Sequence, residues 1–388
     1  MFTADVVIVG GGPAGAAIAL ALARRGLSPI VLEALSAPPT KVGECLPPSI
    51  NPMLDHFGLT ERLRRSGSLR SHGNRFVWGS NSIEERDFIF GPTGAGWRLD
   101  RVTFEDELMQ AATEAGACWR YGQRLVACSR EKDTRFILTV RGLDEVEKYR
   151  ARFVVDATGR SARVAGLLGA RRVIYDRLIG VAAFFHGDAE APADEDSFTL
   201  VEAVAHGWWY SSRLPGGKLV AVYMTDGDLL DHGLRQTDSW VALLNKTEYT
   251  AQRVRKYGVG DPTPPRILPA HTVRLTTVTG DGWLAAGDSA VAYDPLASHG
   301  ISMAMGSGFH AASSIIEFLG GRNDAMRVYE RLIDSSFAHY LLMHHDAYLR
   351  EQRWPRELFW RRRHAPAEGV ARVKRTLEAA KKQVEHYS

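Results

Sequence analysis

The feature that most constrains this chain is a glycine-rich turn near its N-terminus, the stretch GGGPAG at residues 10–15. A short β-branched run, Asp5 to Val9, precedes the turn and is typical of a strand buried in a parallel sheet. An alanine- and leucine-rich stretch follows and predicts a helix ending at Gly26, after which a second apolar run ends on Glu33. Strand, glycine turn, helix, strand and acid in this order predict a βαβ unit that binds a dinucleotide.

The residues of the turn have separate physical roles in such a unit. Gly10 permits the tight turn, Gly12 lets the backbone approach a pyrophosphate, and Gly15 lets helix and strand pack closely. Pro13 and Ala14 stand beside the helix N-terminus, which offers free N–H groups and the positive end of its dipole to phosphates. The acid that ends the second strand can accept hydrogen bonds from the two ribose hydroxyls.

Composition excludes several other classes of protein. The 388 residues suffice for two or three domains, and the content of 45% hydrophobic and 24% charged residues is typical of a globular protein. No apolar run reaches the ~18 residues of a membrane helix, and the N-terminus lacks a basic signal region, so we expect no membrane span and a cytoplasmic location.

The net charge of +3 is too small to predict nucleic-acid binding. The cysteines form no C-x-x-C pair, and His344 and His345 cannot share a helix face, so no metal site is predicted.

Two later stretches indicate which dinucleotide is bound. The stretch from Gly282 to Gly308 resembles the second FAD signature of the large flavoprotein hydroxylase superfamily. In that family, a strand ends in Gly-Asp and the aspartate binds the ribityl chain, a pattern matched by Gly287 and Asp288. The resemblance also implies that the following turn and helix start approach the flavin ring, and the matching residues are Pro295, His299, Gly300 and Ile301.

The middle of the chain carries further motifs of this superfamily. The stretch RFVVDATGRSARV contains Asp156 and Gly159, and Arg101 stands where the family has an arginine facing the FAD pyrophosphate. Gly43, in the stretch VGECLPP, matches a residue beside the flavin. These motifs occur in the family's order along most of the chain. The resemblance therefore implies FAD, with O₂ as a further reactant and with either NAD(P)H or separately reduced flavin as the electron source.

The resemblance implies an α/β fold built from a Rossmann-like FAD-binding domain of the aromatic hydroxylase and glutathione reductase type. We expect that domain at residues 1–174 and 270–325, an antiparallel substrate domain at 175–269, and a helical C-terminal region at 326–388. The sequence does not decide whether part of residues 72–100 belongs to the FAD-binding domain or to the substrate domain. Within 326–388, the last stretch predicts a charged amphipathic helix.

Three consecutive aromatic residues lie in the expected substrate domain. Strand alternation puts Trp208 and Tyr210 on one face and Trp209 on the other. We predict that Trp208 and Tyr210 line the substrate pocket, and the alternative is that all three residues belong to the sheet core.

The same stretch, together with VGECLPP, resembles the flavin-dependent halogenases, but both halogenase signatures are missing. The stretch from Trp208 to Pro215 departs from the pattern Trp-x-Trp-x-Ile-Pro. Residues 69–82, where halogenases need a lysine, contain none, and Lys41 precedes the Gly-Glu pair instead of following it. These departures disfavour halogenation.

The C-terminal part indicates a different branch of the superfamily. Ala347 to Ala365 resembles the tail of a halogenase-like subgroup that includes flavoproteins maturing tryptophan-derived quinone cofactors. That resemblance implies a monooxygenase that hydroxylates an electron-rich aromatic, such as a tryptophan of a partner oxidase or dehydrogenase precursor, through a flavin C4a-hydroperoxide. Trp354 to Arg363 mixes aromatic residues with arginines, a composition typical of interface anchors, so we predict that a partner protein docks there. A helix packing its aromatics on the core is the alternative.

Two residues are candidates for proton handling, namely His299 beside the flavin and Glu44. Each has a structural alternative, because His299 could fill space and Glu44 could anchor its loop. Cys45 has no partner cysteine and is not predicted to be catalytic. Other functions left open are hydroxylation of a small aromatic natural-product intermediate, halogenation, isoprenoid reduction or cyclisation, and a non-catalytic maturation role.

Overall fold

The computed structural model describes residues 1–37, 41–88, 90–131, 135–142, 145–187, 196–322 and 324–365. The chain forms two compact units. Unit 1 comprises Met1–Ser71, Gly91–Ile174 and Val273–Ile333, and unit 2 comprises His72–Phe90, Tyr175–Thr272 and the chain from Asp334 onward. The domains predicted from the sequence were defined by cofactor and substrate binding. The division into two compact units does not test those functions, so the predicted domain boundaries stay predictions. The amphipathic helix predicted near the end of the chain lies outside the described residues.

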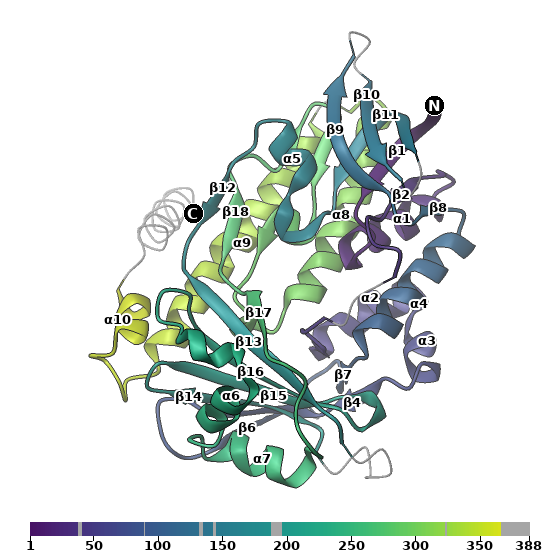
Figure 1. Ribbon diagram of the computed structural model, residues 1–388. Coiled ribbons are helices and arrows are strands. Elements are labelled where there is room, and N and C mark those ends of the chain that lie inside the picture. Colours follow the sequence, from purple (N-terminus) through teal and green to yellow (C-terminus); the bar gives the residue numbers. More distant parts are fainter. Residues whose placement is uncertain are drawn as a thin grey trace, which may run out of the picture. The chain divides into compact units, whose positions relative to one another are not determined.

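Unit 1 is built on an eight-stranded sheet in the described part of the chain. Its central strands run in the order β20, β11, β1, β2, β8 and are all parallel, while the β9–β10 hairpin and β19 add antiparallel pairs. The strands are β1 (Phe2–Val9), β2 (Ile30–Leu32), β8 (Cys118–Arg120), β9 (Arg124–Arg130), β10 (Phe136–Arg141), β11 (Val146–Asp156), β19 (Thr279–Gly280) and β20 (Trp283–Ala285). Figure 1 shows the β9–β10 hairpin extending from this sheet.

Helix α1 is central to unit 1 because it packs against both α4 and α8. All its residues after the first are buried, which explains why alanine dominates its sequence. Gly308 of α8 allows the close approach, since a methyl group there would lie 2.8 Å from the carbonyl oxygen of Ala14. The helices of this unit are α1 (Pro13–Ala23), α2 (Asn51–His56), α3 (Thr60–Arg65), α4 (Arg101–Glu114), α5 (Arg163–Leu167) and α8 (Gly300–Leu319).

Two three-stranded sheets complete unit 1. One consists of β3 (Cys45–Leu46), β7 (Gly96–Arg98) and β4 (Leu69–Ser71), and the other of β12 (Arg172–Ile174), β18 (Val273–Leu275) and β21 (Val291–Ala292). Short 3-10 helices lie at Pro48–Ile50, Gly159–Ser161, Gly287–Ser289 and Pro295–Ala297. The boundary between the units falls inside the long helix α9 (Ala325–Leu349).

Unit 2 contains a seven-stranded sheet in the order β17, β13, β16, β15, β14, β5, β6. All neighbours pair antiparallel except β14 and β5, which pair in parallel. Its elements are β5 (Gly73–Val77), β6 (Glu84–Asp87), β13 (Leu178–Phe185), β14 (Phe198–Val204), β15 (Gly207–Arg213), β16 (Leu219–Asp226), β17 (Arg266–Pro269), α6 (Thr237–Leu244), α7 (Tyr249–Tyr257) and α10 (Leu358–His364), with 3-10 helices at Pro215–Gly217 and His232–Arg235.

One face of the unit 2 sheet is covered by α6 and α7 (Figure 1). Trp209 of β15 is buried there against Trp240 of α6 and Tyr223 of β16. The antiparallel strands expected from the sequence are therefore confirmed. Among the helices of the described ranges, none combines the length and the apolar composition needed to cross a bilayer.

Candidate functional site

The glycine turn joins the end of β1 to the start of α1, at the carboxyl edge of the parallel strands. Gly10 has a φ of +105°, and a methyl group there would overlap the carbonyl of Ala157. A methyl group on Gly15 would overlap the carbonyl oxygen of Gly10. Around Gly12, by contrast, no atom lies within 4 Å of an added methyl carbon. The turn therefore faces open space at Gly12, beside the unpaired N–H groups of the first turn of α1.

The acid at the end of β2 closes one side of this turn. The Oε2 atom of Glu33 accepts a hydrogen bond of 2.8 Å from the amide of Gly11, and Oε1 accepts one of 2.9 Å from Leu35. A carboxylate oxygen can accept more than one hydrogen bond, so these contacts fix the acid while leaving acceptor capacity for hydroxyl groups.

Asp156 supports the loop that follows β11. It is fully buried, and Oδ1 accepts hydrogen bonds from the amide and hydroxyl of Thr158 at 3.0 and 2.7 Å. Its Oδ2 accepts one of 2.8 Å from the amide of Ala165. The loop then exposes Gly159, which has a φ of +64° and open space where a side chain would be. The structure thus places Asp156 beneath the loop, and direct contact with a cofactor stays a prediction for both residues.

Gly287 and Asp288 lie where the N-terminal ends of α1 and α8 come together. A methyl group on Gly287 would lie 2.7 Å from Cβ of Ala14, and the amide of Gly287 donates to Oγ of Ser307. The Asp288 side chain is 41% exposed, with Oδ2 3.7 Å from Nε of Arg160. Burial raises the pKa of Asp288, and the charges of Arg160 and Arg101 oppose that rise. The side chain of Asp288 is therefore partly buried and remains accessible to a ligand.

The second helix N-terminus, that of α8, begins at Gly300 as the sequence predicted. His299 stands at the N-cap without a side-chain capping hydrogen bond, so the first amides of α8, which include Ile301, lack intrahelical partners. The hydroxyl of Ser302 is buried and has no partner in the described part of the chain. Pro295 opens the short 3-10 helix before this turn. The side chain of His299 is exposed, and desolvation by neighbouring atoms lowers its pKa below the ordinary value.

Arg101, the first residue of α4, anchors the segment that carries Gly43. Its Nη1 donates to the carbonyls of Val42 and Gly43 at 2.8 and 3.0 Å, and its Nη2 donates to Oε1 of Glu105 at 2.5 Å. Lys41 binds the other oxygen of Glu105 at 2.6 Å. The Nε atom of Arg101 is buried without a partner in the described residues. Glu105 was missed by sequence reasoning, although its position four residues after Arg101 on one helix was a usable signal.

Glu44 follows Gly43 and is 1% exposed. Its Oε2 accepts a hydrogen bond of 2.9 Å from the amide of Gly43, whose φ is +91°. Next along the chain, Cys45 is half-buried in β3 and pairs with Arg98 of β7. The burial of the Glu44 carboxylate fits a residue that fixes its loop, and proton transfer by Glu44 stays a prediction.

These observations test whether a phosphate-containing flavin dinucleotide fits unit 1. Open space faces Gly12, Gly159 and Gly300, where a ligand can approach the backbone. Two helix N-termini supply unpaired N–H groups for a pyrophosphate and for a polar ring edge. Buried atoms at Arg101 and Ser302 still lack partners among the described residues. The residues present therefore fit FAD.

A family model described as FAD binding domain matches residues 3–331. This chain belongs to that FAD-binding family. The protein is accordingly a flavoprotein of the FAD-dependent aromatic hydroxylase and halogenase superfamily, and the family is one of enzymes. A curated relative, the putative FAD-dependent oxidoreductase LodB of Marinomonas mediterranea, is 29% identical over 374 residues, which are 93% of this chain and 97% of the relative.

Two solved structures establish the fold of this FAD-binding protein. The myxobacterial chondrochloren halogenase CndH superposes with a TM-score of 0.85 at 21% identity, covering 100% of this chain and 90% of the other. The peptidyl tryptophan dihydroxylase QhpG, essential for tryptophylquinone cofactor biogenesis, superposes with a TM-score of 0.74 at 22% identity, covering 93% and 78%. The predicted α/β architecture with a Rossmann-like FAD-binding domain is confirmed.

The two predicted pocket residues of the FAD-binding protein, Trp208 and Tyr210, differ in burial. Trp208 is 1% exposed, its Nε1 donates to the hydroxyl of Tyr348 at 3.0 Å, and its ring lies edge-on to Trp78. Tyr210, on the same face of β15, is half-buried. Trp208 is thus packed inside unit 2, beneath residues that are remote in the sequence. A pocket role for either residue stays a prediction.

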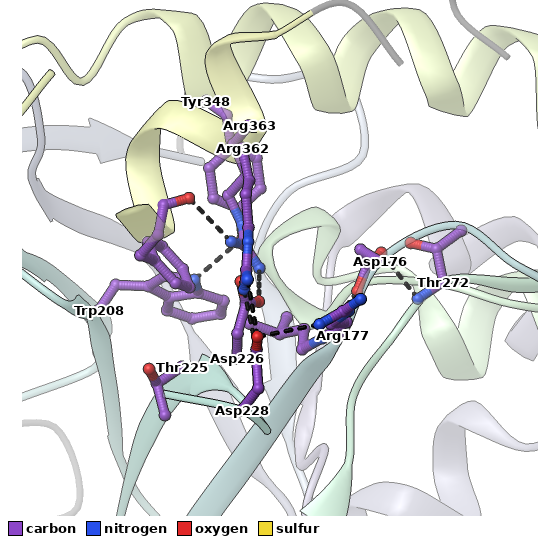
Figure 2. Close-up of polar contacts among 12 residues, drawn as sticks. Asp176, Arg177, Trp208, Thr225, Asp226, Asp228, Thr272, Tyr348, Arg362 and Arg363 are labelled. Atoms are coloured by element: carbon purple, nitrogen blue, oxygen red, sulfur yellow. Dashed lines mark hydrogen bonds and ion pairs between the residues drawn. The ribbon is translucent and has the colours of Figure 1, made fainter. Parts of the chain in front are cut away.

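Two arginines of α10, Arg362 and Arg363, form an ionic cluster with aspartates at the end of β16 (Figure 2). Arg362 donates to Asp226 and Asp228, and Arg363 donates to Asp226, at 2.6–2.8 Å. Arg177 binds Asp228 at 2.9 Å. The hydrogen bond from Arg362 lowers the pKa of Asp228 far below its usual range.

The aromatic residues of α10 are also packed inside unit 2. Phe359 and Trp360 are fully buried, and Nε1 of Trp360 donates to the carbonyl of Val204 at 3.0 Å. The predicted docking segment, Trp354 to Arg363, therefore presents other side chains to solvent, namely Pro355, Arg356, Leu358 and Arg361. Partner docking at this segment stays a prediction.

Proposed function

We propose that the protein is an FAD-dependent monooxygenase that hydroxylates an electron-rich aromatic ring, with the tryptophan side chain of a partner protein as the preferred substrate class. FAD, when bound, supplies the oxygen-transfer chemistry. The proposal is supported by the fold shared with QhpG, a peptidyl tryptophan dihydroxylase, together with the resemblance of the C-terminal segment to flavoproteins that mature quinone cofactors.

One observation carries the choice of hydroxylation over halogenation. Halogenases need a lysine in the segment after the Gly-Glu pair, and residues 69–82 contain none. The lysines that the structure describes in unit 1 are Lys41 and Lys148. Lys41 is paired with the buried carboxylate of Glu105, and Lys148 is on β11, opposite Thr139 of the β9–β10 hairpin. Neither lysine has a position that suits the halogenase role.

The roles of individual residues follow from their contacts. The unpaired amides of Gly12, Ala14 and Gly15 would bind the pyrophosphate, and those of Gly300–Ser302 would bind the ring edge. Asp288 would accept hydrogen bonds from the ribityl hydroxyls. The side chain of His299 is exposed at the start of α8, and an imidazole can accept a proton, so we propose that His299 handles protons beside the ring. Glu44 is buried, so we propose that it anchors the loop and does not move the proton.

Product analysis tests the proposal. The purified protein, supplied with reduced FAD and isotopically labelled O₂, would be incubated with free tryptophan, with a tryptophan-containing peptide and with a simple phenol, in buffer containing bromide. We expect mass spectrometry to show labelled oxygen on the aromatic ring, with the peptide the best substrate. Bromine on the product would indicate a halogenase. Dehydrogenation without oxygen incorporation would refute a monooxygenase.

A further inference from the structure

Trp119 lies beside the glycine turn although no sequence motif singles it out. It occupies β8, opposite Val31 of β2, and because side chains alternate along strands it shares its sheet face with Glu33. A methyl group on Gly11 would lie 2.5 Å from Cζ2 and 3.1 Å from Cε2 of Trp119, and 3.2 Å from Oε2 of Glu33. The indole and the carboxylate thus approach the same point of the turn.

This contact explains the glycine at position 11. Gly11 is not one of the described glycines that have a positive φ. Its backbone conformation therefore does not require a residue without a side chain. The space that a side chain would take is filled by the indole ring. Gly10 and Gly15 are needed by the backbone and Gly12 faces open space, whereas Gly11 is needed by Trp119.

The indole N–H of Trp119 is the second observation. Its Nε1 atom is buried and has no hydrogen-bond partner among the residues described. An indole nitrogen is only a donor, and burying an unsatisfied donor costs about 1–3 kcal/mol. Nε1 is bonded to Cε2, one of the two ring atoms nearest Gly11, so the unsatisfied donor lies at the turn itself.

We propose that Trp119 is a cofactor-binding residue that contacts the adenosine half of FAD and donates a hydrogen bond from Nε1 to one of its acceptor atoms. The turn and the terminal acid of β2 are where a βαβ unit holds the adenosine ribose and pyrophosphate. Ribose oxygens and the ring nitrogens of adenine are acceptors, which an indole donor can satisfy. Trp119 therefore favours FAD over FMN, which lacks the adenosine. This inference depends on FAD binding and is independent of the reaction proposed above.

Fluorescence titrations of the purified apoprotein with FAD and with FMN test the proposal. Trp119→Phe keeps an aromatic ring and removes the N–H. We expect it to weaken FAD binding roughly two- to tenfold, the range for one hydrogen bond, and to leave FMN binding unchanged. Trp119→Tyr restores a donor and is expected to recover part of the preference for FAD.

Trp97→Phe is the matched control because Trp97 is also buried in unit 1, and its Nε1 already donates to Oδ1 of Asn51 at 2.8 Å. This variant should keep the FAD-to-FMN affinity ratio of the unmodified protein. Equal losses for FAD and FMN in Trp119→Phe would show that the indole only supports the turn, and no loss for either would also overturn the proposal. If Trp119→Phe fails to fold, Trp119→Tyr replaces it in the comparison. A lower FAD-to-FMN affinity ratio in Trp119→Tyr than in Trp97→Phe would then support the proposal, and equal ratios would overturn it.

Discussion

The glycines of the turn differ in what excludes a side chain, and Gly12 allows the sharpest test. Its backbone is extended, with a φ of −70° that alanine adopts, and its added methyl group meets no atom within 4 Å. We expect Gly12→Ala to lower apoprotein stability by about 1 kcal/mol at most, the cost of a poorer N-cap. FAD affinity should fall at least tenfold, because the methyl group occupies the path of the pyrophosphate. Thermal unfolding and FAD titration measure the two effects separately.

Gly15→Ala is the control for this prediction. Its methyl group would overlap the carbonyl oxygen of Gly10, so the apoprotein itself should be strongly destabilised. A Gly12→Ala protein that binds FAD as tightly as the unmodified protein would contradict the assignment of the open side of the turn to the pyrophosphate.

Single residues show how far sequence reasoning reaches. Gly10, Gly12 and Gly15 could be identified because their spacing is local and their strand and helix flank them. Trp119 could not, since its significance arises from its contact with Gly11, which only the folded chain creates. Glu105 had a local signal in its position four residues after Arg101, but its ion pair with Lys41 arises only in the folded chain. The sequence therefore predicted the position of the glycine turn. It could not predict which side chains from distant parts of the chain would contact that turn in the folded protein.

At the scale of elements, α10 is attached to β16 by charges of very different exposure. The side chain of Asp226 is 2% exposed and accepts from both Arg362 and Arg363, whereas that of Asp228 is 37% exposed. We expect Asp226→Asn to lower the free energy of unfolding by roughly 3–5 kcal/mol, because Arg363 would remain buried without its counter-charge. Asp228→Asn should cost about 1 kcal/mol or less, as for exposed ion pairs. Chemical denaturation of the two variants measures the difference.

The pH dependence of the same pair provides a second check. Arg362 holds the pKa of Asp228 below its ordinary value, so the folded state keeps this carboxylate ionised where the unfolded chain protonates it. Its contribution to stability is therefore complete above the ordinary pKa of 3.8 and is lost as the pH falls below that value. Asp228→Asn should show a shallower loss of stability in acid. Equal slopes would indicate that Arg362 does not hold Asp228 in solution.

The same elements mark the limit of sequence prediction. The strands β13 to β16 followed from alternation and glycine turns, which are local signals. For Trp208 the sequence left a pocket position and a core position open, because the two side chains that cover it, Trp78 and Tyr348 of α9, lie far from it in the sequence. A face of a strand can be predicted from its pattern, but the segment that covers the face depends on long-range pairing.

At the scale of the whole molecule, every residue predicted to bind the cofactor falls in unit 1, although these residues come from three separate stretches of chain. Unit 2 contains Trp208, Tyr210 and the ionic cluster of α10. The two units therefore carry separable functions in the prediction, with cofactor binding in the first and substrate binding in the second.

Hydrogen–deuterium exchange of the protein with and without FAD tests this separation. A ligand that binds only the folded state slows the opening of the segments it contacts. We expect FAD to slow exchange most at the first turns of α1 and α8, where Ala14 and Gly300–Ser302 have no intrahelical partners, and at the Val42–Glu44 segment. Amides of α6 and α7 in unit 2 are the internal reference and should exchange at nearly unchanged rates. Protection concentrated on the unit 2 sheet would instead mean that the cofactor residues were assigned to the wrong unit, because the amides that a ligand binds directly are those whose opening it must suppress.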